Sequence, residues 1–116
     1  RVASRGLGDV YKRQIYEGVK KSFYGRPVTI HRMSTAQWFD TFDQKLDWIY
    51  VDASHGYDGC LHDLTRAVGM IKPGGKLFGD DYGPNKLGVK NAVDQFIKNT
   101  GYTLNNFHDD QFEVQL

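Results

Sequence analysis

Apolar residues recur at helical spacing near the start of the chain. Ile15, Val19 and Phe23 are each four residues apart, which predicts one apolar face of a helix. Gly25 and Pro27 follow, and both residues favour a turn over a continued helix. We therefore expect a helix over residues 15–23 that ends in a turn.

A short strand and a second helix are predicted next. Apolar and polar residues alternate over residues 28–32, as they do in a half-buried strand. Ser34 or Thr35 can then cap a helix, because a side-chain oxygen at that position accepts a hydrogen bond from the first helical turn. The apolar residues of this helix are Trp38, Phe39 and Phe42.

The middle of the chain reads as strand, helix and strand. Residues 47–51 are aromatic and β-branched without alternation, which predicts a strand covered on both faces in a parallel sheet. A helix follows, broken at residues 72–75, and residues 76–79 form the next strand. The apolar face of that helix comprises Leu61, Leu64, Val68 and Ile71.

The last part of the chain predicts a helix and a hairpin. A helical stripe of spacing i, i+3, i+4, i+7 and i+8 stops at Asn99 and Gly101. Residues 102–104 and 112–116 then read as two strands joined by a turn over 105–110. The stripe consists of Val89, Ala92, Val93, Phe96 and Ile97. Strands that alternate with helices indicate an α/β fold built of βαβ units.

Composition narrows the function classes. Residues 1–14 are basic, glycine-punctuated and lack an apolar period, so we expect a non-native leader there and a domain over 15–116. The net charge of +1 gives no support to nucleic-acid binding. No run approaches the ~18 apolar residues of a membrane span, so we expect no membrane partner and a cytoplasmic protein. Cys60 lacks the neighbours of a zinc site and is interpreted as a small apolar residue.

Three aspartates follow two predicted strands directly. Asp52 comes after the first, and Asp80 and Asp81 after the second. Ligands of open parallel sheets bind beyond the carboxyl ends of the strands, where these carboxylates would converge. Like charges held that close favour a hard cation such as Mg²⁺. The alternative is that the aspartates only cap turns and the following helix.

His55 lies three residues after Asp52, in a loop that contains glycines. A histidine at this edge of the sheet, beyond the carboxyl ends of the strands, can act as a general base near neutral pH. We call this edge the rim. The alternative is an ordinary loop histidine that makes local hydrogen bonds.

Two segments carry a family resemblance. The sequence VDASHGY over residues 51–57 and KPGGKLFGDDYG over residues 72–83 together resemble the class I S-adenosylmethionine-dependent methyltransferases. The likeness is to small-molecule O-methyltransferases of the macrocin and catechol types, and it covers only the carboxy-terminal half of their domain. VKNAVDQFI, residues 89–97, resembles the helix that follows in that family.

This resemblance implies roles for the same rim. In the metal-dependent members the corresponding acids bind Mg²⁺, which places the metal on Asp52, Asp80 and Asp81. His55 stands where the catechol-type enzymes have the basic residue that takes the hydroxyl proton, and Asp52 is the other candidate acceptor. Ser34 stands in the family's adenine loop, so Ser34 and Asp52 are the expected S-adenosylmethionine contacts. The implied substrate is a small-molecule hydroxyl.

The resemblance also implies a truncated Rossmann-like fold. We expect a mostly parallel sheet with a C-terminal antiparallel hairpin, in which the first two strands of the family are missing. Those strands lie between the third and fourth strands of the family's sheet. Either the strand over 28–32 slides across to pair with 47–51, or 47–51 shows an open edge that allows a homo-oligomer.

Three hypotheses remain from the sequence. In the first, the parent protein is a Mg²⁺-assisted O-methyltransferase, and this chain by itself is inactive. In the second, the chain is a non-catalytic α/β module that assembles through the open edge. The third, a metal-binding phosphotransfer or hydrolase fragment, ranks last because neither a nucleophile context nor a phosphate loop is present.

Overall fold

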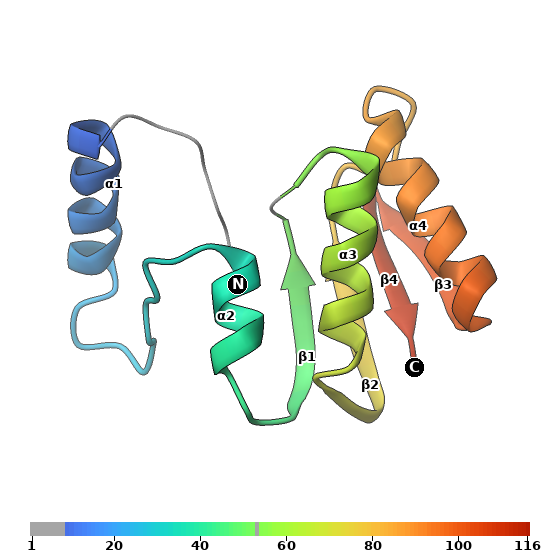
Figure 1. The fold of residues 1–116 in the computed structure, drawn as a ribbon, viewed down its shortest axis with the longest axis horizontal. Helices are drawn as coiled ribbons and strands as arrows, with labels where there is room; N and C mark the ends of the chain where they lie inside the picture. Colours follow the sequence, from blue (N-terminus) through green and yellow to red (C-terminus); the bar gives the residue numbers. More distant parts are fainter. Residues whose placement is uncertain (1–8, 53) are drawn as a thin grey trace.

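The computed structural model describes residues 9–52 and 54–116. Within them, four strands form one mixed sheet of order β1-β2-β4-β3, with all four helices outside it (Figure 1). The strands are β1 Leu46–Val51, β2 Ile71–Gly79, β3 Thr103–His108 and β4 Gln111–Gln115. The helices are α1 Asp9–Ser22, α2 Thr35–Thr41, α3 Tyr57–Val68 and α4 Leu87–Thr100.

The expected truncated Rossmann-like α/β fold is confirmed, and its sheet is mixed. β1 and β2 are parallel, whereas β4 runs antiparallel to both β2 and β3, as the expected hairpin requires. The sheet is therefore less parallel than predicted. β1–β2 is the single parallel pair among the described strands, because the further strand expected over 28–32 does not form.

The strand predicted over residues 28–32 is wrong. These residues are not assigned to a strand, and the Val28 side chain is 47% exposed. An isolated strand has no ladder partner for its backbone, so alternation alone did not produce one. β1 consequently forms one edge of the described sheet, which matches the open-edge alternative.

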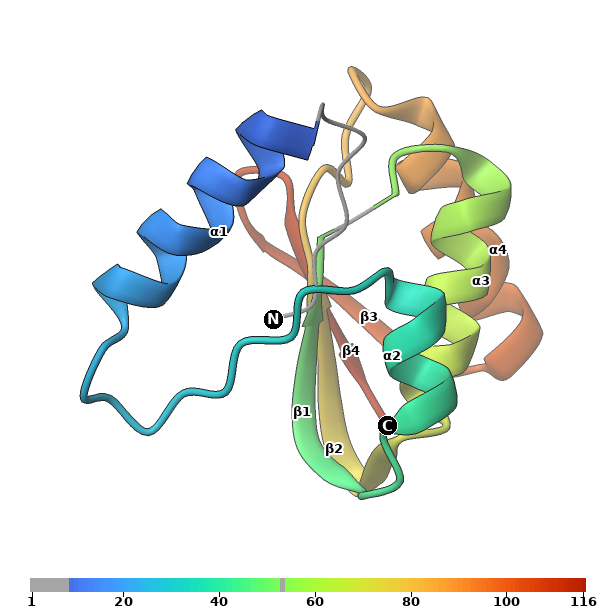
Figure 2. The ribbon, with the colours of Figure 1, turned by 60° about the vertical axis from the view of Figure 1, so that its left-hand side comes forward.

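Helices cover only one face of this sheet. Figure 2 shows α2, α3 and α4 on one side, whereas α1 stands apart on the other. The prediction that β1 is covered on both faces is therefore wrong, since Ile49 is buried but Trp48 is 58% exposed. Trp48 packs edge-on against Phe78 of β2, with ring centroids 6.0 Å apart.

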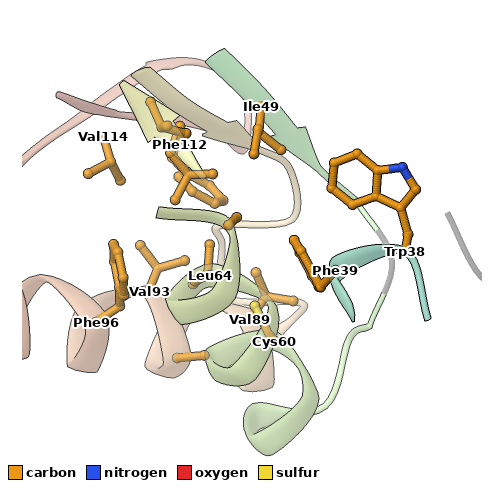
Figure 3. Packing of buried hydrophobic residues seen from close by; sticks show 14 residues of the cluster. Trp38, Phe39, Ile49, Cys60, Leu64, Val89, Val93, Phe96, Phe112 and Val114 are labelled. Atoms are coloured by element: carbon orange, nitrogen blue, oxygen red, sulfur yellow. The ribbon is translucent and has the colours of Figure 1, made fainter. Parts of the chain in front are cut away.

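The core lies between the sheet and helices α3 and α4 (Figure 3). The stripe predicted on α4 is confirmed, with Val89, Val93 and Phe96 all buried. They meet Phe112 and Val114 of β4, which are also buried. Burial of such side chains contributes roughly 1.5–3 kcal/mol each, so this layer supplies much of the stability.

Helix ends were predicted with mixed success. Gly101 closes α4 with φ 75°, a left-handed conformation that glycine adopts at little cost. α3, however, ends at Val68, and Ile71 begins β2 instead of extending the helix. β2 thus starts five residues before the predicted residue 76, and its pairing with β1 is irregular between Leu46 and Trp48.

The first helix begins earlier than predicted. α1 starts at Asp9 and includes part of the segment expected to be a leader. α1 ends at Ser22, one residue before the predicted end at Phe23. Its apolar residues Tyr11, Ile15 and Val19 remain substantially exposed, as does Phe23 directly after it. Residues 1–8 lie outside the described part, so the domain boundary at 14/15 stays a prediction.

Candidate functional site

Parallel pairing brings the two acidic strand ends side by side. Val51 pairs with Gly79, so the residues that follow them emerge at the same edge of the sheet. A side chain at Gly79 would meet the Phe112 ring, with Cζ only 2.3 Å from the Cβ position. Glycine here lets β4 approach β2 closely beneath the rim.

Three of the predicted site residues converge at this rim. Asp52, His55 and Asp81 each offer a ligand atom, and these atoms lie within 4.8 Å of one another. The His55 Nε2 atom lies 3.0 Å from Asp81 Oδ2, with the two side chains 53% and 26% exposed. Two carboxylates and an imidazole are a donor set that fits a divalent cation.

Asp80 plays a different part from Asp81. The Asp80 Oδ1 atom accepts a hydrogen bond from the Asp81 backbone N–H at 2.7 Å. This contact is the turn capping that the sequence left open as an alternative, and Asp80 is not one of the three converging residues. Its role as a metal ligand stays a prediction.

A narrow pocket opens at the rim. Asp52, His55, Asp80 and Asp81 form its polar side, together with Ser54. Its floor is apolar and consists of Val51, Cys60, Leu64, Val89 and Phe112. Its volume is about 10 Å³, which is room for about one water-sized ligand such as an ion.

Cys60 is held as a neutral thiol in this floor. It is 4% exposed, and burial raises its pKa to about 11, with the nearby Asp63 adding to the shift. A protonated thiol is a poor nucleophile and a poor metal ligand. Both observations agree with the interpretation of Cys60 as a small apolar residue.

The His55 loop is packed between α3 and α4. A Cβ at Gly88, in the first turn of α4, would lie 2.5 Å from the His55 carbonyl oxygen. A Cβ at Gly59, in α3, would lie 2.3 Å from the Ser54 Oγ atom. These two glycines allow both helices to press against the loop, and the loop therefore places His55 over the rim.

Ser34 occupies a separate place. Its Oγ atom accepts a hydrogen bond from Gln37 N at 3.2 Å, and its own N–H donates to the Gln37 side chain at 3.0 Å. This reciprocal capping box starts α2 and confirms the predicted cap. Ser34 does not line the rim pocket. Its contact with a cofactor stays a prediction.

Two polar contacts near the site had no direct sequence signal. The buried Asp63 accepts a hydrogen bond from Thr35 Oγ1 at 3.4 Å, which links α3 to α2, and burial raises its pKa. Tyr82 donates a hydrogen bond to Asp94 at 2.6 Å across twelve residues of sequence. The i,i+4 spacing of Lys90 and Asp94 was the one visible signal for the second network.

Comparison with known proteins identifies the family. The family model described as a methyltransferase domain matches residues 5–82. This match covers more than half of the chain and includes the whole rim. The chain belongs to this methyltransferase family. The class I S-adenosylmethionine-dependent resemblance of the sequence is thereby confirmed.

Solved structures share the fold of this methyltransferase chain. A protein from Clostridium thermocellum provisionally named as an rRNA-methylase aligns with a TM-score of 0.68 and 13% identity over 99% of the chain and 72% of its own. A protein from Staphylococcus aureus provisionally named as a caffeoyl-CoA O-methyltransferase aligns with a TM-score of 0.67 and 16% identity. The alignment covers 99% of this chain and 63% of that protein. The O-methyltransferase from Bacillus cereus, solved in complex with SAH, aligns with a TM-score of 0.62 and 13% identity. The alignment covers 99% of this chain and 61% of that protein.

These identities establish the fold alone. The chain spans under two thirds of the length of the two O-methyltransferase relatives. A search of curated proteins finds no match. No helix in the described part of the chain has the length and apolar character needed to cross a membrane.

Proposed function

We propose that the parent protein transfers a methyl group from S-adenosylmethionine to a hydroxyl of a small molecule, assisted by Mg²⁺ or a similar divalent cation. The observation that carries the proposal is the convergence of Asp52, His55 and Asp81 at the strand ends of a methyltransferase fold. Neighbours named as O-methyltransferases support the hydroxyl acceptor.

The residues at the rim would have two roles, cation binding and proton acceptance. Asp52 and Asp81 would hold the cation through carboxylate oxygens, with the His55 imidazole as the third ligand. Asp80, the third acid that the resemblance implies, would contribute less, because its Oδ1 atom accepts the Asp81 N–H. A bound divalent cation supplies charge that lowers the pKa of a hydroxyl oxygen beside it. His55 or Asp52 would then accept the hydroxyl proton. The contact of Asp81 with Nε2 orients the His55 ring and leaves Nδ1 as the nitrogen for either role.

A matched pair of acceptor probes tests the hydroxyl role. Catechol can chelate a cation through two adjacent oxygens, whereas phenol offers only one. Catechol should alter the electron paramagnetic resonance spectrum of Mn²⁺ bound to the protein, and phenol should alter it much less. An unchanged spectrum with catechol would contradict the proposed acceptor class.

The cofactor contacts are proposed at Ser34 and Asp52, and this chain by itself is proposed to be inactive. S-adenosylmethionine needs partners for its carboxylate, amine, ribose and adenine, and the resemblance assigns this chain only the adenine loop at Ser34 and the carboxylate of Asp52. Each lost hydrogen bond costs roughly 0.5–1.5 kcal/mol, and micromolar binding corresponds to about 8 kcal/mol in all. Calorimetry with S-adenosylhomocysteine should therefore give millimolar or weaker binding. A low-micromolar dissociation constant would refute the inactivity.

A second candidate is assembly through the free edge of β1. Trp48 on this edge is 58% exposed, and β1 pairs only with β2 among the described strands. Two copies of β1 paired antiparallel about Ile49 would place each Trp48 opposite Tyr50 of its partner, a favourable aromatic cross-strand pair. Analytical ultracentrifugation tests this, because Trp48→Lys would replace the exposed aromatic partner with a charge and shift dimers to monomers. A wild-type chain that is monomeric at high concentration would exclude it.

A further inference from the structure

Tyr82 ties the acidic strand-end loop to α4. Its hydroxyl donates a hydrogen bond to Asp94 Oδ1 at 2.6 Å. Lys90 Nζ donates to the other carboxylate oxygen of Asp94 at 2.8 Å and lies 5.2 Å from the centre of the Tyr82 ring. The phenol is thus held by a charged acceptor that is itself held by a second residue of the same helix.

The rest of Tyr82 is anchored as firmly. Its backbone N–H donates to the Asp110 carbonyl oxygen at 2.9 Å, in the turn between β3 and β4. Its ring centroid lies 6.1 Å from that of Phe112, which is 1% exposed. Tyr82 therefore joins the loop to three elements at once: α4, the hairpin turn and β4.

The neighbouring residue, Asp81, needs such support. Its φ of 66° lies in the left-handed region, which is sparsely populated by residues with a Cβ, although Asp adopts it more readily than most. A conformation of this kind persists only where the surroundings determine it. The local hydrogen bond from the Asp81 N–H to Asp80 does not reach beyond the loop. The Asp81 side chain itself reaches His55, and Tyr82 adds the contacts to α4, to the hairpin turn and to β4.

We propose that Tyr82 is a positioning residue that holds the Asp81 carboxylate against His55 and so preorganises the rim. The consequence for a bound cation rests on the function proposed above, whereas the placement of Asp81 does not. Burial alone would raise the pKa of Asp94, but hydrogen bonds from Lys90 and Tyr82 outweigh it and lower that pKa.

The test compares two phenol-to-phenyl substitutions. Tyr82→Phe removes the hydroxyl and leaves the ring on Phe112. Tyr102→Phe is the matched control, because that ring packs on Phe96 at the far end of α4. Two quantities are measured for each variant: hydrogen exchange of the Asp81 amide by NMR, and the dissociation constant of Mn²⁺ by electron paramagnetic resonance.

We expect Tyr82→Phe to accelerate Asp81 exchange about tenfold, which corresponds to ~1.4 kcal/mol, and to raise the Mn²⁺ dissociation constant by a similar factor. Tyr102→Phe should leave both quantities at their wild-type values. Asp94→Asn keeps an acceptor oxygen without the charge, so it should give a smaller change in the same direction. This variant carries the test if Tyr82→Phe does not fold.

The two proposals fail in distinguishable ways. If the wild-type chain binds no Mn²⁺, the cation part of the proposed function fails, and Asp81 exchange alone decides the role of Tyr82. Unchanged Asp81 exchange in Tyr82→Phe would overturn the positioning role. Where the wild type does bind Mn²⁺, an unchanged dissociation constant in Tyr82→Phe would overturn it as well.

Discussion

Gly88→Ala tests whether close packing of α4 places the His55 loop. The added Cβ would lie 2.5 Å from the His55 carbonyl oxygen and 3.3 Å from the Tyr57 backbone nitrogen. Both neighbours are backbone atoms, so no side-chain rotation can relieve the contact. Either α4 or the His55 loop must shift.

The magnitude follows from two opposing effects. Alanine is favoured over glycine within a helix by up to ~1 kcal/mol, and less at the first turn where Gly88 lies. Overpacking against a fixed backbone costs roughly 1–3 kcal/mol. We therefore expect Gly88→Ala to lower the free energy of unfolding by about 1–2 kcal/mol and to weaken the contact between His55 and Asp81.

Gly69→Ala is the matched control. Gly69 closes α3 with φ −67°, and its Cβ would lie 3.4 Å from the Arg66 carbonyl oxygen, an ordinary van der Waals distance. Alanine fits this conformation, so the control should be neutral or stabilising by up to ~1 kcal/mol. Urea unfolding gives both free energies, and NMR reports the His55 and Asp81 resonances. Equal stability of the two variants with unshifted rim resonances would refute the packing argument.

Three further predictions concern other parts of the chain. Cys60 is buried with a pKa of about 11, so a thiol reagent at pH 8 should modify it only at the rate of unfolding; immediate modification would contradict its burial. The pKa of Asp63 is raised by burial, so its stabilising contribution is full below the unfolded value of ~3.9 and is lost as the pH rises through the folded value. The unfolding free energy of Asp63→Asn relative to wild type should therefore increase from pH 4 to pH 7, and a flat difference in urea melts would count against it. Deleting residues 1–14 should change the unfolding free energy by under ~1 kcal/mol, because the exposed face of α1 contributes little to the core; a larger loss would show that this segment is structural.

Local periodicity predicted the elements that pack on one core. The stripe of α4 and the cap of α2 at Ser34 were both readable, because they depend on spacing and on short-range hydrogen bonds. The strand over 28–32 failed because a strand needs a neighbour, and alternation does not reveal whether one is present. β1 is one-sided for a similar reason, since its sequence does not show which face the helices cover.

The rim was predicted in part. The convergence of Asp52, His55 and Asp81 follows from strand ends that parallel pairing brings together. The different geometry of Asp80 depends on the left-handed backbone of the next residue, which no sequence pattern indicated. The contact of Tyr82 with Asp94 is long-range and became visible only in the folded chain.

The most direct test of the proposed cation site is the Mn²⁺ affinity of two neighbouring variants. Asp81→Asn removes a carboxylate that converges with Asp52 and His55, whereas Asp80→Asn retains an oxygen able to accept the Asp81 N–H. We predict that Asp81→Asn raises the Mn²⁺ dissociation constant at least ~tenfold, the loss expected when a charged partner is removed, and that Asp80→Asn changes it by much less. Equal affinities of wild type and Asp81→Asn, or a larger loss in Asp80→Asn, would contradict the assignment of the site to Asp52, His55 and Asp81.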